Sequence, residues 1–238
     1  GCSLQHLEFR AQVAVKQRIL EDAFWHIGRV QAEEVMSPIY GAPWSYRHRA
    51  RLSARLVRKK GGMLVGFHEK RSSFIADMTS CDVLPPMVSE LLPGLREVLG
   101  SLSIREQLPQ IELAVGTKDT VLVLRILNAL SDADEAVLKA FAETRGVALW
   151  LQPKGPETAV PFWPDRPEEL FYELPDFGLR LRFRPTDFTQ INHSVNRLMI
   201  RRAIALLAPT IQDRVVDLFC GLGNFTLPIA VKGAQVHG

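Results

Sequence analysis

The glycine-rich stretch RVVDLFCGLGNFTLPIA, residues 214–230, constrains the fold more strongly than any other part of the chain. Its apolar residues Val215, Val216, Leu218 and Phe219 are typical of a parallel strand buried on both faces. Gly221 and Gly223 allow a sharp turn and the close approach of a ligand to the backbone. The helix expected next presents free amides to an electronegative group. The stretch therefore predicts a strand, a turn and a helix that hold a nucleotide-like cofactor.

The spacing of the glycines discriminates between cofactors. A dinucleotide site requires a third glycine three residues after the second, and Thr226 occupies that position. A nicotinamide cofactor is therefore disfavoured. The pattern Asp-x-Phe-x-Gly-x-Gly-Asn, which begins at Asp217, resembles instead the first motif of the S-adenosylmethionine-dependent methyltransferases.

The rest of the chain alternates predicted helices and strands. Apolar residues at three- and four-residue steps predict a long amphipathic helix over 4–27. From residue 46 a period of two predicts strands, with a hairpin turn at the KKGG sequence. Further helices are expected over 85–102, 131–146 and 193–209, and further strands over 110–116, 120–127 and 147–153. Residues 152–170 are rich in proline and charge and predict a loop or boundary.

This order predicts an α+β central domain with an antiparallel or mixed sheet, followed by the beginning of an α/β Rossmann-like methyltransferase domain. The expected domains are 1–44, a long helix and connector that packs on the catalytic domain; 45–175, the central RNA-binding domain; and 176–238, the start of the methyltransferase domain.

The charge is distributed unevenly along the chain. Residues 45–71 contain nine basic side chains and one acid, which gives this segment a net charge of +8, whereas the whole chain carries +3. Such a local excess favours a polyanion such as nucleic acid, and a solvated basic strand pair is the alternative. No stretch is apolar enough for a membrane helix, so we expect a cytoplasmic protein without a membrane partner. We also expect a monomer.

Four motifs together resemble the RNA 5-methyluridine methyltransferases. They are GCSLQHL at residues 1–7, YRHRARL at 46–52, DMTSCDVLPP at 77–86, and DFTQIN at 187–192 before the glycine turn. The resemblance is strongest to the bacterial members that carry a 4Fe-4S cluster and act on 23S ribosomal RNA. It implies methyl transfer from S-adenosylmethionine to C5 of a uridine in that RNA.

The resemblance also implies the cofactor-binding residues. Gln190 would bind the amino acid part of S-adenosylmethionine, and Phe219, Gly221 and Gly223 would line the adenosine site. Asn224 matches another contact position and is expected to cap the turn. Asp217 is expected to orient the loop.

Cys2 and Cys81 match two of the four cluster ligands of the family. The other two would lie before Gly1. Two unrelated buried cysteines are the alternative. Thiolates from distant segments are the usual ligands of such clusters.

For the RNA, Arg51 matches a family arginine near the substrate, and Arg47 and Arg49 share its face if the strand is regular. Arginine contacts to phosphate give salt-dependent affinity without sequence choice. Phe188 would pack against an extruded base, or else contribute to the core.

The family mechanism requires a thiolate that attacks C6 of uracil, and then a base that removes the C5 proton. The family's nucleophile lies in a Ser-Cys-Asn-Pro sequence, which is absent here, and Cys220 is interpreted as a packing residue. We therefore expect the nucleophilic cysteine and the general base to lie beyond the C-terminus, in a longer parent enzyme. A non-catalytic RNA-binding module on a cluster-stapled α+β domain is the alternative, and a nicotinamide-dependent oxidoreductase is a weaker one.

Overall fold

A computed structural model describes residues 3–238. The chain divides into two compact units, one that ends at Pro43 and one that spans Trp44–Gly238. In the first unit, helix α1 (Phe9–Asp22) is capped by the carboxylate of Glu8, which accepts hydrogen bonds from two backbone amides. A π-helical turn, Ala23–Gly28, extends it. The helix predicted over 4–27 is confirmed from Phe9 onward.

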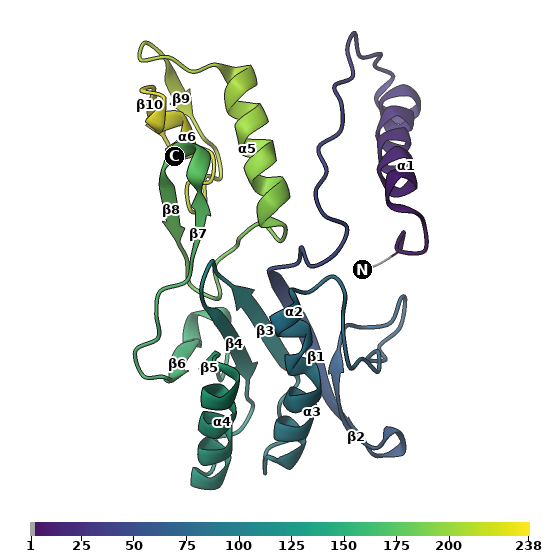
Figure 1. Cartoon of the computed structure of the whole chain (residues 1–238), viewed down its shortest axis with the longest axis vertical. Helices are drawn as coiled ribbons and strands as arrows, with labels where there is room; N and C mark the ends of the chain where they lie inside the picture. The colour runs from purple at the N-terminus through teal and green to yellow at the C-terminus, as the bar shows by residue number, and fades with distance from the viewer. Residues whose placement is uncertain (1–2) are drawn as a thin grey trace. The chain divides into compact units, whose positions relative to one another are not determined.

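The second unit is built on a six-stranded sheet with the strand order β2-β1-β3-β4-β5-β6 (Figure 1). The strands are β1 (Arg49–Val57), β2 (Gly62–Gly66), β3 (Gln110–Val115), β4 (Thr120–Arg125), β5 (Ala148–Gln152) and β6 (Val160–Trp163). Only β4 and β5 pair in parallel among them. A three-residue 3-10 turn, Arg58–Lys60, connects β1 to β2 at the predicted hairpin. The predicted mixed α+β sheet is confirmed.

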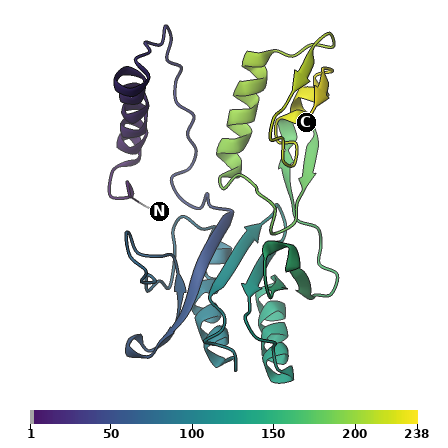
Figure 2. The same cartoon turned by 180° about the vertical axis from the view of Figure 1, so that it is seen from behind.

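Helices cover one face of this sheet. They are α2 (Pro86–Ser89), α3 (Leu91–Ser101) and α4 (Asp132–Arg145), and α3 and α4 lie side by side on the sheet in Figures 1 and 2. Alternate residues of the strands, such as Leu52, Ile111 and Leu124, point into the core beneath the helices. No helix within residues 3–238 combines the length and apolarity that a membrane crossing requires.

A second apolar cluster lies on the opposite face of the sheet, at one end. There Ala114 and Val121 pack with residues of the hairpin β7 (Phe171–Leu174) and β8 (Leu179–Arg182) and of helix α5 (His193–Leu207). Two further 3-10 turns are Pro156–Thr158 and Pro175–Phe177. The domain boundary predicted between residues 175 and 176 falls within the turn of this hairpin. That boundary remains a prediction.

The prediction of a loop over 152–170 is wrong in one part, because β6 adds an edge strand to the sheet there. Pro161 lies within β6, and only an edge strand tolerates a proline, since proline cannot donate a ladder hydrogen bond.

The chain continues with β9 (Arg214–Val216), α6 (Thr226–Val231) and β10 (Gln235–His237). β9 and β10 pair in parallel, which confirms the predicted start of an α/β domain. The prediction that the strand is buried on both faces is wrong, because Val216 and Leu218 are exposed. Within residues 3–238, β9 pairs only with β10 and ends before Leu218.

Candidate functional site

The glycine turn is an open backbone loop with an exposed aromatic ring. Phe219 has φ +63° and a fully exposed side chain. Gly221 and Gly223 have φ +55° and +84°, the left-handed region that favours glycine. A Cβ on Gly223 would lie 2.9 Å from Cγ of Leu227, whereas a Cβ on Gly221 would meet nothing within 4 Å.

A short hydrogen bond holds the turn in place. The hydroxyl of Thr226 donates to Oδ2 of Asp217 at 2.5 Å, so Asp217 orients the loop as predicted. Within the described residues the backbone amides of Phe219, Cys220 and Gly221 donate no backbone hydrogen bond. The turn therefore offers free amides and an exposed ring, which fits the polar and aromatic parts of S-adenosylmethionine.

Asn224 does not cap the turn, so that prediction is wrong. Its side chain forms a two-way amide pair with Asn196, with both N–H to O distances at 2.9 Å, and Oδ1 also accepts from the hydroxyl of Tyr172 at 3.0 Å. Asn196 is buried on α5. Because a buried amide must find partners, this pair ties the glycine turn to the first turns of α5.

The segment before α5 is the predicted DFTQIN motif, and the asparagine pair joins it to the glycine turn. Asn192 caps α5 by accepting the amide of Val195 at 3.0 Å, and Gln190 is exposed beside it. Phe188 is 78% exposed, which excludes core packing for its ring. The structure thus connects Gln190 and the glycine turn through the first turn of α5.

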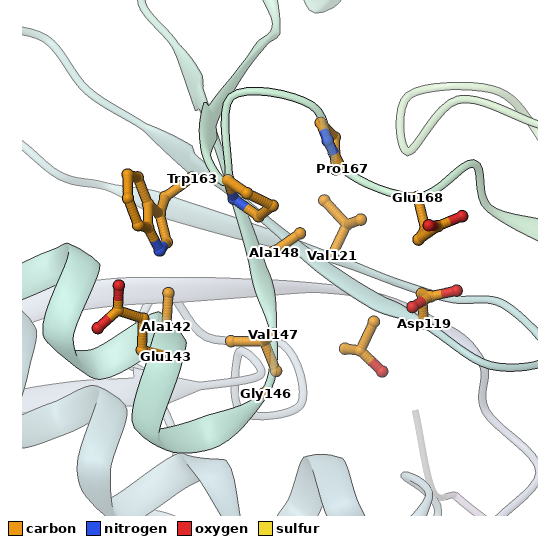
Figure 3. A pocket seen from close by; sticks show the side chains of 12 residues that line it. Asp119, Val121, Ala142, Glu143, Gly146, Val147, Ala148, Trp163, Pro167 and Glu168 are labelled. Carbon is orange, nitrogen blue, oxygen red and sulfur yellow. The ribbon is translucent and has the colours of Figure 1, made fainter.

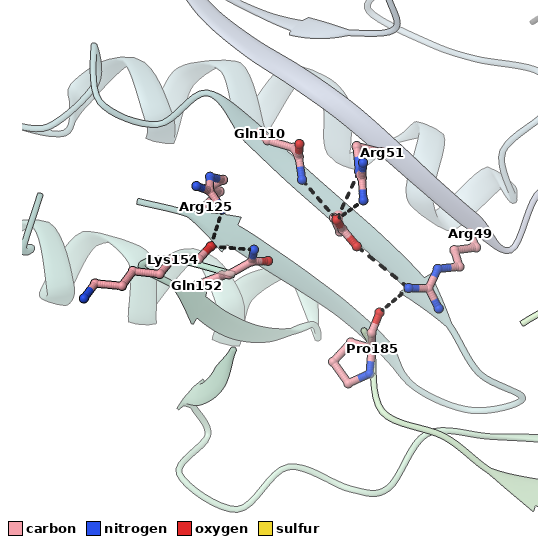
Figure 4. Close-up of polar contacts among 8 residues, drawn as sticks. Arg49, Arg51, Gln110, Arg125, Gln152, Lys154 and Pro185 are labelled. Carbon is pink, nitrogen blue, oxygen red and sulfur yellow. Dashed lines mark hydrogen bonds and ion pairs between the residues drawn. The ribbon is translucent and has the colours of Figure 1, made fainter. Parts of the chain in front are cut away.

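Arg49 and Arg51 lie on the sheet face opposite helices α3 and α4, as their cross-strand partners Ala114 and Glu112 show (Figure 4). Arg51 donates from Nε and Nη2 to one oxygen of the buried Glu112 carboxylate, at 3.1 and 2.7 Å. Arg49 donates to the carbonyl of Pro185 at 2.9 Å and lies 3.8 Å from the other carboxylate oxygen. The Arg51 side chain is 66% exposed and that of Arg49 is 19% exposed. Of these two, Arg51 is therefore the more accessible to a phosphate.

Arg47 does not share this face on a regular strand, because β1 begins only at Arg49. Its guanidinium lies 5.4 Å from the centre of the Phe67 ring, a cation–π contact. The expected row of three arginines is thus reduced to Arg49 and Arg51.

A stacked histidine pair lies between β1 and α5. The rings of His48 and His193 are 4.2 Å apart and nearly parallel, and Tyr172 lies 5.4 Å from His193. Burial, together with the neighbouring His48, lowers the pKa of His193 to about 4. Burial raises the pKa of Tyr172 to about 12. Both groups are therefore neutral at pH 7, and sequence reasoning missed them.

Of the two cysteines predicted to bind a 4Fe-4S cluster, the structure describes one, Cys81. Cys2 lies outside the described residues. Cys81 is a half-buried free thiol that packs against the core, and its amide donates to Oγ of Ser89 at 2.7 Å. Among residues 3–238 no three histidine, cysteine or acidic side chains are grouped to hold a metal. These residues alone do not supply the four thiolates of a cluster.

A separate hollow of about 290 Å³ lies between α4 and the edge of β4 and β5 (Figure 3). Its side chains include the acids Asp119, Glu143 and Glu168. This acidic lining repels phosphate, so the hollow does not suit nucleic acid.

Comparison with known proteins identifies the family. A family model described as tRNA (uracil-5-)-methyltransferase matches residues 8–237. The chain belongs to this family. The resemblance inferred from the four motifs is thereby confirmed.

Curated relatives within the family are similar along the whole chain. Proteins of Burkholderia ambifaria and Cupriavidus necator, both named 23S rRNA (uracil(1939)-C(5))-methyltransferase RlmD, are 59% identical over 239 and 238 residues. These alignments cover 100% of this chain and 51% and 54% of the relatives. The chain therefore spans about half the length of the curated relatives it matches.

A solved structure supports the fold. The tRNA (uracil-54, C5)-methyltransferase of Pyrococcus abyssi, in complex with S-adenosyl-L-homocysteine, matches with a TM-score of 0.70 at 20% identity. The match covers 99% of this chain and 57% of that one. At this identity the likeness shows a shared fold.

Proposed function

We propose that the whole protein transfers a methyl group from S-adenosylmethionine to C5 of a uridine in 23S ribosomal RNA, at the position that the relatives' names give as 1939. The observation that carries this proposal is the asparagine pair, because it joins the exposed glycine turn to the DFTQIN segment beside the arginine face. The names of the relatives with 59% identity supply the nucleic acid and the atom.

The cofactor would occupy the open turn. The exposed ring of Phe219 offers a surface for the adenine, and the free amides and the exposed Gln190 offer hydrogen bonds to polar groups. Asn224 would position the turn through its hydrogen bonds to Asn196. When bound, S-adenosylmethionine supplies an electrophilic methyl group.

The RNA would lie on the face that carries Arg51. Arg51 presents its exposed guanidinium to a phosphate, and the exposed ring of Phe188 stacks on an extruded base. The carbonyl of Pro185, which accepts from Arg49, fixes the Phe188 segment next to β1. The base and the cofactor would therefore meet at the DFTQIN segment.

The nucleophilic cysteine and the general base belong to the proposal as residues outside this chain. Cys220 is half-buried in the turn, and its thiol lies 3.8 Å from the carbonyl of Gly221. This contact with a backbone carbonyl supports the interpretation of Cys220 as a packing residue.

A 4Fe-4S cluster bound by Cys2 and Cys81 is also proposed, from the motifs that surround both cysteines. Iron analysis of the whole protein prepared without oxygen tests it. Iron is expected in the wild type and a loss of iron in Cys81→Ser, with Cys220→Ser as the matched control. Iron-free wild-type protein would contradict the cluster. A cytoplasmic monomer remains part of the proposal.

Family membership disfavours both alternatives, the non-catalytic RNA-binding module and the oxidoreductase. Calorimetry on the whole protein separates the three. S-adenosylmethionine is expected to bind and NAD is not. Binding of NAD alone would favour the oxidoreductase, and binding of RNA without either cofactor would favour the module.

A further inference from the structure

A second hollow lies further along β1, on the face of the sheet that carries Arg51. Its volume is about 600 Å³, and its polar lining comes from Ser53, Arg55, His68, Glu106, Gln110 and Arg125. Arg55 follows Arg51 by four residues, so it lies on the same face of the strand about 13 Å away. The hollow is large enough for a nucleotide.

The cations of this hollow are more available than those beside the target site. Arg51 is tied to Glu112, whereas Arg55 makes no hydrogen bond or ion pair in the part of the chain that the structure describes. Arg125 donates from Nη1 to the carbonyl of Lys154 and keeps its other donors. Glu106, the acid of the lining, lies 3.6 Å from Arg58 outside the hollow. The lining therefore carries an excess of positive charge.

The surroundings of the hollow are also basic. The turn Arg58–Lys60 follows β1, and the loop after His68 carries Lys70, Arg71 and the exposed ring of Phe74. Arg55, Arg58, Lys59 and Lys60 thus lie at this end of β1, beyond Arg51, whereas the loop after His68 runs back towards Arg47. Binding of the target uridine alone leaves that charge without a role.

We propose that this hollow binds the sugar-phosphate backbone of the RNA outside the target loop, with phosphates at Arg55 and Arg125. The apolar side chains of Ile75 and Pro109 suit the ribose between them. This inference rests on the proposed function, since it takes RNA as the ligand. β1 would then guide the RNA from Phe188 at one end to the hairpin at the other.

The experiment compares two RNAs bound by the whole protein, a minimal target stem-loop and the same stem-loop with single-stranded flanks. Arg55→Gln is expected to weaken binding of the flanked RNA several-fold and to lower its salt slope by about 0.7, the value for one phosphate contact to a single strand. The minimal stem-loop should change less than twofold. Arg55→Lys should retain the slope, and Arg145→Gln on α4, beneath the opposite face, should change neither RNA.

An unchanged affinity and slope for the flanked RNA would overturn the proposal. So would an equal loss on both RNAs, because it would place Arg55 at the target site. Failure of the proposed function would be distinct, since it would appear in the wild type as an absence of S-adenosylmethionine binding and of methyl transfer.

Discussion

At the scale of single residues, the glycine turn contains two glycines that differ in their surroundings. Both have positive φ, so alanine at either position costs on the order of 1 kcal/mol in backbone strain. At Gly223, but not at Gly221, the added Cβ would also lie 2.9 Å from Cγ of Leu227. We expect Gly223→Ala to weaken S-adenosylmethionine binding to the whole protein by tenfold or more, and Gly221→Ala by less. Calorimetry with both variants measures this, and equal affinities would show that the contact is irrelevant.

The buried carboxylate of Glu112 offsets part of the positive charge of Arg49 and Arg51 on β1. It accepts from Arg51 and from Nε2 of Gln110 at 3.0 Å, and burial lowers the pKa of the adjacent Arg49 while Glu112 opposes that shift. Glu112→Gln removes the negative charge. We expect a fold less stable by about 1 to 2 kcal/mol, yet RNA binding with a salt slope steeper by roughly 0.7 or more.

Salt titrations of RNA binding by the whole protein check this pair of effects. Glu135→Gln is the matched control, because Glu135 pairs with Lys139 on α4, the helix-covered side. A slope that does not change in folded Glu112→Gln protein would mean that the arginines do not face the RNA.

At the scale of elements, helix α4 depends on the carboxylate of Asp134. Burial by itself raises the pKa of Asp134, but hydrogen bonds from Ser103 and Ser131 outweigh it and lower the pKa to about 2. Ser131 and Asp134 form the capping box, and Asp134 also accepts the amide of Ser103 at 2.7 Å. Because the folded pKa lies below the unfolded value, this stability is present above about pH 4 and is lost as the pH falls towards 2.

We therefore expect Asp134→Asn to lower the free energy of unfolding by on the order of 1 to 2 kcal/mol at pH 7 and by less at pH 3. Denaturant titrations at the two pH values measure the difference. An equal loss at both would show that the charge of Asp134 does not contribute.

Elements with a clear period or cap were predictable from the sequence, and those that depend on distant partners were not. Helix α4 is predicted by Ser131 and Gly146 at its ends, and both cap it. Strands β6 and β7 were not predicted, because each is four residues long, with a proline inside β6 and directly after β7. A short strand of this kind is stabilised by its neighbours rather than by its own pattern.

The same distinction holds in the site. Gln190 and the glycine turn follow from motifs, whereas the contact of Arg51 with Glu112 spans 61 residues and that of Asn196 with Asn224 spans 28. Two signals were nevertheless present. Glu112 interrupts an apolar strand, and Asn196 lies on the buried stripe that continues with Ile200 and Ile204. A polar residue in a buried pattern indicates a specific partner.

At the scale of the second unit, Trp44–Gly238, the stacked histidines connect the start of β1 to the first residue of α5. The backbone of His48 makes a second connection, because its amide donates a hydrogen bond to the carbonyl of Ile191 at 2.9 Å. The pKa of His193 is about 4 in the folded chain, below the ordinary 6.5. Between these values the unfolded chain binds a proton that the folded chain does not, so stability falls as the pH drops from 6.5 towards 4.

We expect His193→Phe, which keeps a stacked ring, to remove this part of the acid sensitivity. The wild type should lose about 1 to 2 kcal/mol more than the variant between pH 7.5 and pH 5. Unfolding titrations at both pH values measure the loss. Equal losses of unfolding free energy in the two proteins would mean that the pKa of His193 is not lowered in the folded chain.

We propose that this chain forms the cofactor turn and the RNA face of a uridine C5 methyltransferase. The most direct measurement incubates the whole protein with S-adenosylmethionine carrying an isotopic methyl group and with unmodified 23S ribosomal RNA, and then maps the label by mass spectrometry. We expect labelled 5-methyluridine at one position, and much less of it with Arg51→Gln. Folded protein that binds S-adenosylmethionine and leaves every uridine unlabelled would contradict it.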